Sequence, residues 1–146
     1  MSTKLDVKQW AVASLAVFVI MTIFTFVFSK LGIEPWAMPV PASQPGVGPD
    51  PTMGRIATYL SRLVMAALVT YIFTKTYREK PGIAHGLRYG LGMGLLLYVP
   101  NFIGGLVYWD LSAMSQTTFM VVGVIQYVAC GAAIAWLYNP GKPAAA

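Results

Sequence analysis

Residues 9–29, QWAVASLAVFVIMTIFTFVFS, contain no charged side chain and lie between Lys8 and Lys30. The length of this stretch matches that of a transmembrane helix, which needs about 20 predominantly apolar residues to cross the hydrocarbon core. A cleavable signal peptide is the competing interpretation, but the small residues Val40 and Ala42 that could define a cleavage site lie too far beyond the apolar run. We therefore predict a retained transmembrane helix.

Three further apolar segments follow, at residues 56–74, 83–109 and 117–138. The chain of 146 residues is 57% hydrophobic and only 10% charged, with a mean hydropathy of +0.64, whereas soluble domains carry about 25% charged residues. Nothing outside the apolar segments is long enough to bury a core of its own, which argues against a separate soluble catalytic domain. The sequence predicts a single all-α membrane domain, residues 1–146, with four transmembrane helices.

The distribution of positive charge predicts the orientation of these helices. Seven Lys and Arg residues fall at the two termini, in the loop after the second segment or just inside the third segment. Only Lys30, Arg55 and Arg62 fall on the opposite side. By the positive-inside rule, both termini are cytoplasmic in a multi-pass protein of the bacterial cytoplasmic (inner) membrane.

The net charge of +5 also predicts a partner class. In a membrane protein, such an excess favours contact with anionic lipids rather than with nucleic acid. The residues expected to contact lipid headgroups are Lys75, Arg78, Lys80 and Arg88.

Residues 31–54 are predicted to form a long loop on the outer side, and they contain six prolines. Because proline lacks an amide hydrogen and fixes φ, we expect an extended segment that is neither a helix nor a central strand. Loops of this length are usually linkers or functional elements. The loop is therefore either a spacer or a strap across a partner subunit, with Trp36 and Met38 as apolar anchors.

Glycines recur every four residues in the third segment, at Gly86, Gly90 and Gly94. Small residues at this spacing let two helix backbones approach closely, which matters in lipid because little hydrophobic drive holds helices together there. The glycine face could pack against another helix of the same chain or against a second chain.

Polar residues inside the segments suggest contacts between helices. Pro100 is predicted to bend the third helix. Counted from the outer turn, Asn101 and Gln126 lie at similar depth, so we predict a hydrogen bond between their amides. Bonds of this kind hold spanning helices together, although the two amides could instead form a polar site on a substrate path.

Arg62 lies seven residues after Arg55, roughly 10 Å inside the second segment at 1.5 Å per residue. A charge at that depth calls for an explanation. An ion pair with Asp110 is one, with Glu34 as the second choice of partner. Snorkelling to the outer surface and a functional ion or headgroup site are the others.

Reactive side chains are scarce. His85 is the one histidine and Cys130 the one cysteine, so the chain cannot supply the three or four ligands of a zinc site. No motif of a hydrolase, kinase, nucleotide-binding protein or metalloprotease is present. We expect no enzyme, no metal and no cofactor apart from bound lipid.

Two side chains still need an interpretation. His85 could provide one axial ligand to haem or chlorophyll, or contact a quinone, only in a pocket that partners complete. The alternative is an interfacial residue that contacts lipid phosphate together with Lys80 and Arg88. Cys130 is expected in the core.

The stretch HGLRYGLGMGL at residues 85–95, followed by an apolar run with Pro100 and a short turn, resembles small four-helix bacterial inner-membrane proteins. The resemblance covers the third and fourth segments. It implies the four-helix fold and carries no agreed activity.

Two functions remain open. The first is a non-catalytic accessory subunit of a larger membrane complex, for example a respiratory or photosynthetic one, whose partners are membrane lipids and other membrane subunits. The second is a small oligomeric channel or carrier with a polar path near Arg62, Asn101 and Gln126.

Overall fold

A computed structural model describes residues 6–30, 51–77, 82–108 and 113–138 of the chain. These residues form the helices α1 (Val7–Lys30), α2 (Pro51–Thr76), α3 (Ile83–Tyr108) and α4 (Ala113–Leu137). Each helix is long and apolar enough to cross a membrane. The predicted all-α fold with four candidate membrane-spanning helices is confirmed, and it is the fold of a multi-pass membrane protein.

Two helix boundaries differ from the prediction by four residues or more. α2 begins at Pro51, so residues 51–54 are helical rather than part of the proline-rich loop. Proline is compatible with a first helical turn because the amide hydrogen it lacks has no partner there. α4 begins at Ala113 rather than at residue 117, and the Thr117 hydroxyl donates to the Ala113 carbonyl at 2.8 Å. Threonine hydroxyls in the first turns of α4 thus find hydrogen-bond acceptors among the backbone carbonyls of the same helix.

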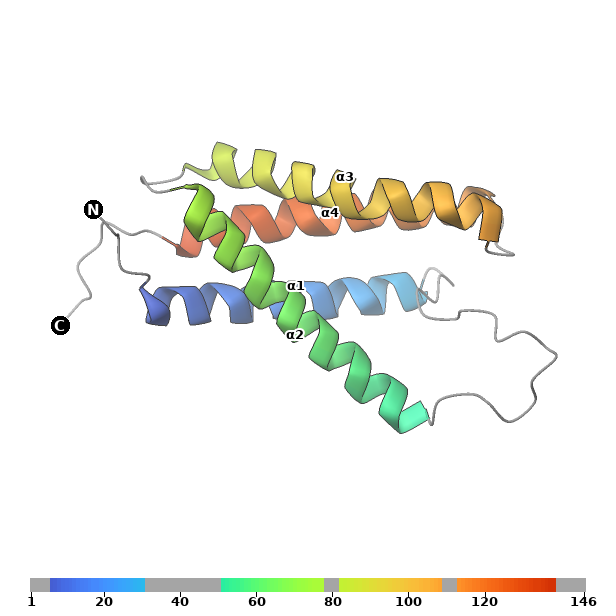
Figure 1. Cartoon of the computed structure of the whole chain (residues 1–146), viewed down its shortest axis with the longest axis horizontal. Coiled ribbons are helices and arrows are strands. Elements are labelled where there is room, and N and C mark those ends of the chain that lie inside the picture. The colour runs from blue at the N-terminus through green and yellow to red at the C-terminus, as the bar shows by residue number, and fades with distance from the viewer. Residues whose placement is uncertain (1–5, 31–50, 78–81, 109–112, 139–146) are drawn as a thin grey trace.

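The helices run alternately up and down, so that α1 begins and α4 ends at the same end of the bundle (Figure 1). We call this the inner end and the opposite end the outer end. Tyr138, directly after α4, is buried, and its burial together with the nearby Asp6 carboxylate raises the pKa of its phenol. The first and last described segments therefore meet at the inner end.

The closest packing in the molecule joins α3 to α4 through glycines. A Cβ atom at Gly86 would overlap the Gly131 carbonyl, and a Cβ atom at Gly131 would overlap the Gly86 carbonyl. One turn further on, a Cβ atom at Gly90 would overlap the Tyr127 carbonyl, and one at Gly94 would lie 3.0 Å from Val124 Cα. The glycine face therefore packs inside the chain, which confirms the first of its two interpretations.

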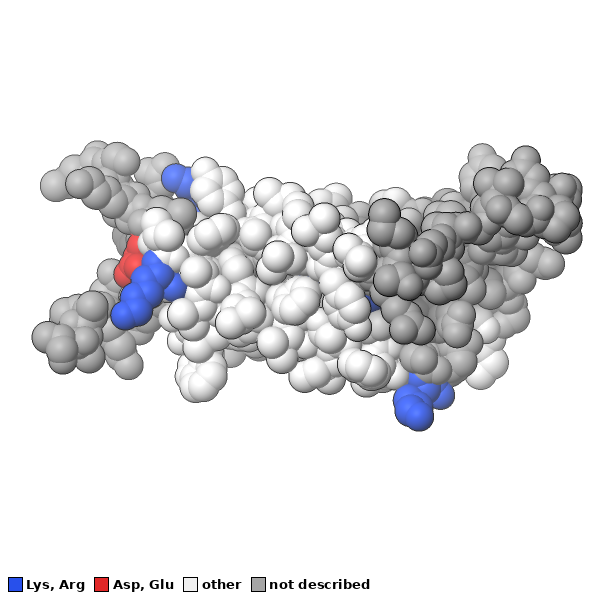
Figure 2. All heavy atoms as spheres, turned by 90° about the horizontal axis from the view of Figure 1, so that it is seen from below, with Lys and Arg blue, Asp and Glu red and all other residues white. Residues whose placement is uncertain are grey.

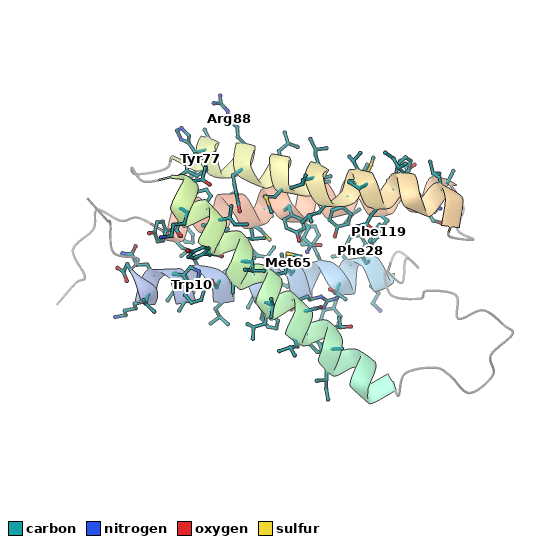
Figure 3. All side chains as sticks on the ribbon, in the orientation of Figure 1. Trp10, Phe28, Met65, Tyr77, Arg88 and Phe119 are labelled. Atoms are coloured by element: carbon teal, nitrogen blue, oxygen red, sulfur yellow. The ribbon has the colours of Figure 1, made fainter. Side chains whose placement is uncertain are left out.

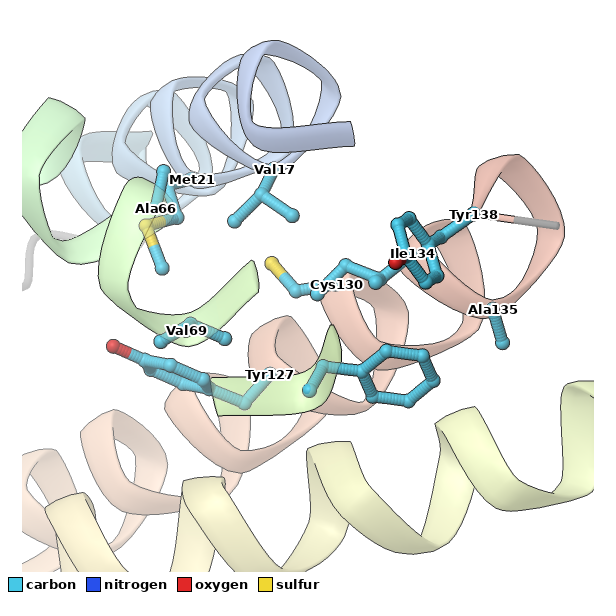
Figure 4. Close-up of a cluster of buried hydrophobic side chains, with 10 residues drawn as sticks. Val17, Met21, Ala66, Val69, Tyr127, Cys130, Ile134, Ala135 and Tyr138 are labelled. Atoms are coloured by element: carbon cyan, nitrogen blue, oxygen red, sulfur yellow. The ribbon is translucent and has the colours of Figure 1, made fainter. Parts of the chain in front are cut away.

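The hydrophobic core lies where α1, α2 and α4 meet. Cys130 is fully buried, as predicted, and Figure 4 shows its side chain directed from α4 toward Val17 of α1. Ala66 and Val69 supply the α2 side of this cluster. α1 packs closely against both α2 and α4 at this cluster.

The outside of the bundle is apolar. Figure 2 shows a broad face without charge, with the charged side chains gathered toward the two ends. Large hydrophobic side chains are exposed on every helix, as at Leu15, Leu60, Leu96 and Ile125. Such a surface is expected of a bundle whose solvent is lipid.

The glycine contacts predict a sharp difference between neighbouring substitutions on α3. Gly90→Ala should destabilise the bundle by about 1–3 kcal/mol, because the added methyl group meets backbone that cannot move aside. The measurement is the midpoint of thermal or dodecyl sulfate unfolding of the detergent-solubilised protein.

Gly92→Ala is the matched control, because a Cβ atom at Gly92 meets nothing within 4 Å. We expect this variant to unfold at the wild-type midpoint or slightly above it, since alanine favours helix over glycine. Equal midpoints for the two variants would contradict the packing described here.

Candidate functional site

α2 packs on the bundle at its inner end and leaves it toward the outer end. Ile56, Leu63, Thr70 and Thr74 lie on one face of the helix, since they are spaced by seven and four residues. Thr70 and Thr74 are 0% and 7% exposed, whereas Leu63 and Ile56 are 47% and 56% exposed. The same face is therefore buried at the inner end and uncovered at the outer end, as the oblique course of α2 shows (Figure 1).

Specific contacts fix the inner half of α2 to both neighbours. The indole Nε1 of Trp10 in α1 donates to the Ala67 carbonyl at 3.3 Å. The hydroxyl of Tyr89 in α3 donates to the Val69 carbonyl at 2.6 Å.

An aromatic cluster strengthens the same end. The rings of Phe73 and Tyr89 lie edge to face with centroids 5.1 Å apart, and Tyr77 stacks beside Phe73 at 4.8 Å. Aromatic pairs of this geometry contribute beyond the area they bury. The joint between α2 and α3 is therefore made by side chains of the inner half.

A second aromatic cluster, at the outer half, joins α1, α3 and α4. The Phe28 and Phe119 centroids lie 5.3 Å apart, as their proximity in Figure 3 illustrates. Tyr98 packs edge-on against Phe119 at 5.2 Å and against Tyr127 at 6.0 Å. A Cβ atom at Gly123 would overlap the Tyr98 ring, so this glycine makes the room that the ring fills. None of these rings comes from α2.

Arg62 is a buried charged residue of this region. It is 9% exposed, and its guanidinium carbon lies 5.8 Å from the centroid of the Tyr59 ring. Because Tyr59 comes three residues earlier, the guanidinium points back toward the N-terminus of α2. The side chain is held against protein rather than along an open lipid surface. Asp110 and Glu34 lie outside the described residues, so the ion pair stays a prediction.

The predicted hydrogen bond between Asn101 and Gln126 is wrong. Asn101 is exposed, and its Nδ2 donates to the Leu97 carbonyl of its own helix at 2.9 Å. Gln126 is buried on α4. Similar depth in the membrane does not bring the two amides together, because Asn101 lies on an exposed face of α3 whereas Gln126 lies on a buried face of α4.

Gln116 supplies the amide link between α3 and α4 instead. Its Nε2 donates to the Gly105 carbonyl at 2.8 Å. The predicted fourth segment began at residue 117, but α4 begins at Ala113 and so includes Gln116 in its first turns. Gly105 has no side chain to shield its carbonyl, which leaves the oxygen accessible to the neighbouring helix.

Pro100 lies inside α3, and the bend predicted there stays a prediction. α3 continues through this residue as far as Tyr108. The proline leaves the Leu96 carbonyl without its usual amide donor.

The basic side chains of His85, Lys75 and Arg88 lie apart from this region, at the inner end of the bundle. His85 is exposed, and its ring lies 5.6 Å from that of Tyr77. Lys75 Nζ lies 5.4 Å from the centroid of the Tyr71 ring, and Arg88 points away from the bundle (Figure 3). Among the described residues, no group of three or more His, Cys, Asp or Glu side chains could hold a metal ion.

Other residues named from the sequence also lie outside the described residues, namely Trp36, Met38, Arg78 and Lys80. The strap interpretation of the proline-rich loop therefore stays a prediction.

No family model, curated protein or solved structure matches this chain. The resemblance at residues 85–95 to small four-helix membrane proteins carries no activity. The candidate site is therefore defined by its geometry, as the outer half of α2 with Arg62 at its inner edge.

The two amides predict different costs of substitution. Gln116→Leu should lower stability by roughly 1 kcal/mol, because it removes a hydrogen bond between two helices. Asn101→Leu should change stability much less, because its bond lies within α3 and its side chain is exposed. Unfolding midpoints in detergent test both, and a larger loss from Asn101→Leu would refute the assignment.

Proposed function

We propose that this chain is a non-catalytic accessory subunit of a larger membrane complex, which it holds through the outer half of α2. In this proposal it lies in the bacterial inner membrane with both termini cytoplasmic. Its partners are other membrane subunits and lipids, and it acts on neither nucleic acid nor a soluble substrate.

The observation that carries the proposal is the departure of α2 from its own bundle. Tyr59, Leu60, Leu63 and Val64 are 46%, 59%, 47% and 52% exposed, and together they span about 140° of the helix circumference at 3.6 residues per turn. Helices in lipid are held together mainly by close packing against one another. A helix that leaves its bundle forfeits these contacts, and a helix of another subunit would restore them.

The position of Arg62 fits such an interface. Its side chain lies at the point where α2 begins to separate, with the Tyr59 ring over the guanidinium. Arginine and tyrosine are the residue types that most often dominate the binding energy of protein interfaces. A partner helix on α2 would contact this pair at its edge.

The alternative of a channel or carrier finds less support. Its path required Arg62, Asn101 and Gln126 to share one polar route. Asn101 is exposed and bonded to its own helix, whereas Gln126 is buried on α4.

A site-specific photocrosslinking experiment tests the proposal. A benzophenone amino acid is placed at Leu60 or Val64 in the native host, the membrane is irradiated, and adducts are identified by mass spectrometry. We expect a discrete adduct with one membrane protein at both positions, recovered in constant ratio after gentle detergent extraction.

Ile125 on α4 is the matched control position, since it is 52% exposed and belongs to a helix that keeps its place in the bundle. It should give no discrete adduct. Equal crosslinking from all three positions, or recovery of this chain alone, would refute the accessory role.

A further inference from the structure

The face of α3 that points away from α4 combines a cation with an unfilled notch. Arg88 and Gly92 are one helical turn apart on this face, and both are exposed. Figure 3 shows Arg88 directed away from the other three helices. The Cα atom of Arg88 lies about 7.5 Å along the helix axis from the start of α3, at 1.5 Å per residue.

Gly92 differs from the glycines that face α4. A Cβ atom there would meet nothing within 4 Å, so close packing within the described bundle does not require a glycine at this position. The side chains beside it on the exposed face are Leu91, Leu95 and Leu96, which are 46%, 45% and 67% exposed. They flank Gly92, which contributes no side chain of its own to this face.

Side-chain direction places the cation and the notch at different depths. Side chains on a helix lean toward its N-terminus, and α3 begins at the inner end. The Arg88 guanidinium therefore reaches toward the inner end of the bundle, where the membrane interface lies. Gly92 lies one turn deeper, at the level of the acyl chains. A phospholipid matches this arrangement, because its phosphate lies at the level of the Arg88 guanidinium and its acyl chains lie at the level of Gly92.

We propose that Arg88 and Gly92 form a binding site for one anionic phospholipid. The guanidinium binds the headgroup phosphodiester in the planar, bidentate geometry that arginine favours. One acyl chain lies over Gly92 between the flanking leucines. The site belongs to the leaflet at the inner end of the bundle.

Charge argues for a lipid and against a second copy of this chain. Two copies related by a twofold axis along the membrane normal would bring Gly92 against Gly92. The two Arg88 side chains, one turn away, would then face each other at the membrane interface, where like charges repel. An anionic lipid meets the same face with opposite charge.

The site is independent of the proposed accessory role, because it lies on α3 and uses no residue of α2. Loss of one proposal leaves the other unchanged.

Native mass spectrometry of the full chain tests the site. The protein is released from nanodiscs of equal parts phosphatidylglycerol and phosphatidylcholine, and bound lipids are counted per chain. We expect one retained phosphatidylglycerol. Arg88→Gln should weaken its retention about tenfold, as the loss of a charge-assisted contact implies. Gly92→Leu, which fills the notch, should weaken it to a similar degree.

Two control variants separate this site from general attraction. Lys75→Gln removes an inner-end cation from α2, and Gly104→Leu fills an open position on the same helix at its outer end. Both should retain the lipid as the wild type does. Melting curves check that every variant folds.

Three results would overturn the proposal. Equal losses from Lys75→Gln and Arg88→Gln would mean diffuse attraction of anionic lipid. Normal retention in Gly92→Leu would mean that Arg88 meets a headgroup, or a free phosphate, without a seated acyl chain. Equal retention of phosphatidylcholine would mean that the charge of the headgroup is not recognised.

Discussion

The contact of glycine backbone with glycine backbone between α3 and α4 is the constraint on which the rest of the structure depends. Gly86 and Gly131 each occupy the space that a side chain on the other would need, and Gly90 lies equally close to Tyr127. Because lipid offers no hydrophobic drive to pair helices, contact at this distance is what makes α3 and α4 a unit. The polar link from Gln116 to Gly105 closes the outer end of the same unit.

The two aromatic clusters attach α1 and α2 to this unit unequally. Phe28 joins α1 to the outer half through Phe119, whereas α2 is joined to α3 through Tyr89 at the inner half. The outer half of α2 therefore stands apart with an apolar surface. A protein built in this way has a packed portion and a helix whose outer half protrudes from it.

The sequence predicted the spans well and the contacts unevenly. Uninterrupted apolar length is sufficient to define four helices, and the spacing of Gly86, Gly90 and Gly94 indicated close packing, although not the helix that receives it. Depth counting failed for Asn101 because a helix also fixes rotation, which no count along the chain supplies. The separation of α2 had no signal, since Leu63 and Ile56 are as apolar as buried residues would be. The sequence offered one weak indication of the aromatic contacts between helices, namely the small residue Gly123, which leaves room for the Tyr98 ring.

Distances between spin labels test the central claim, that α2 is joined to the bundle at one end and separate at the other. Labels at Leu60 and Ile103 report on the outer end, and labels at Ile72 and Leu87 report on the inner end; all four side chains are exposed. Pulsed electron–electron double resonance in nanodiscs should give a clearly longer distance for the outer pair of labels than for the inner pair. Equal distances for the two pairs would show that α2 lies along the bundle, and would contradict this account.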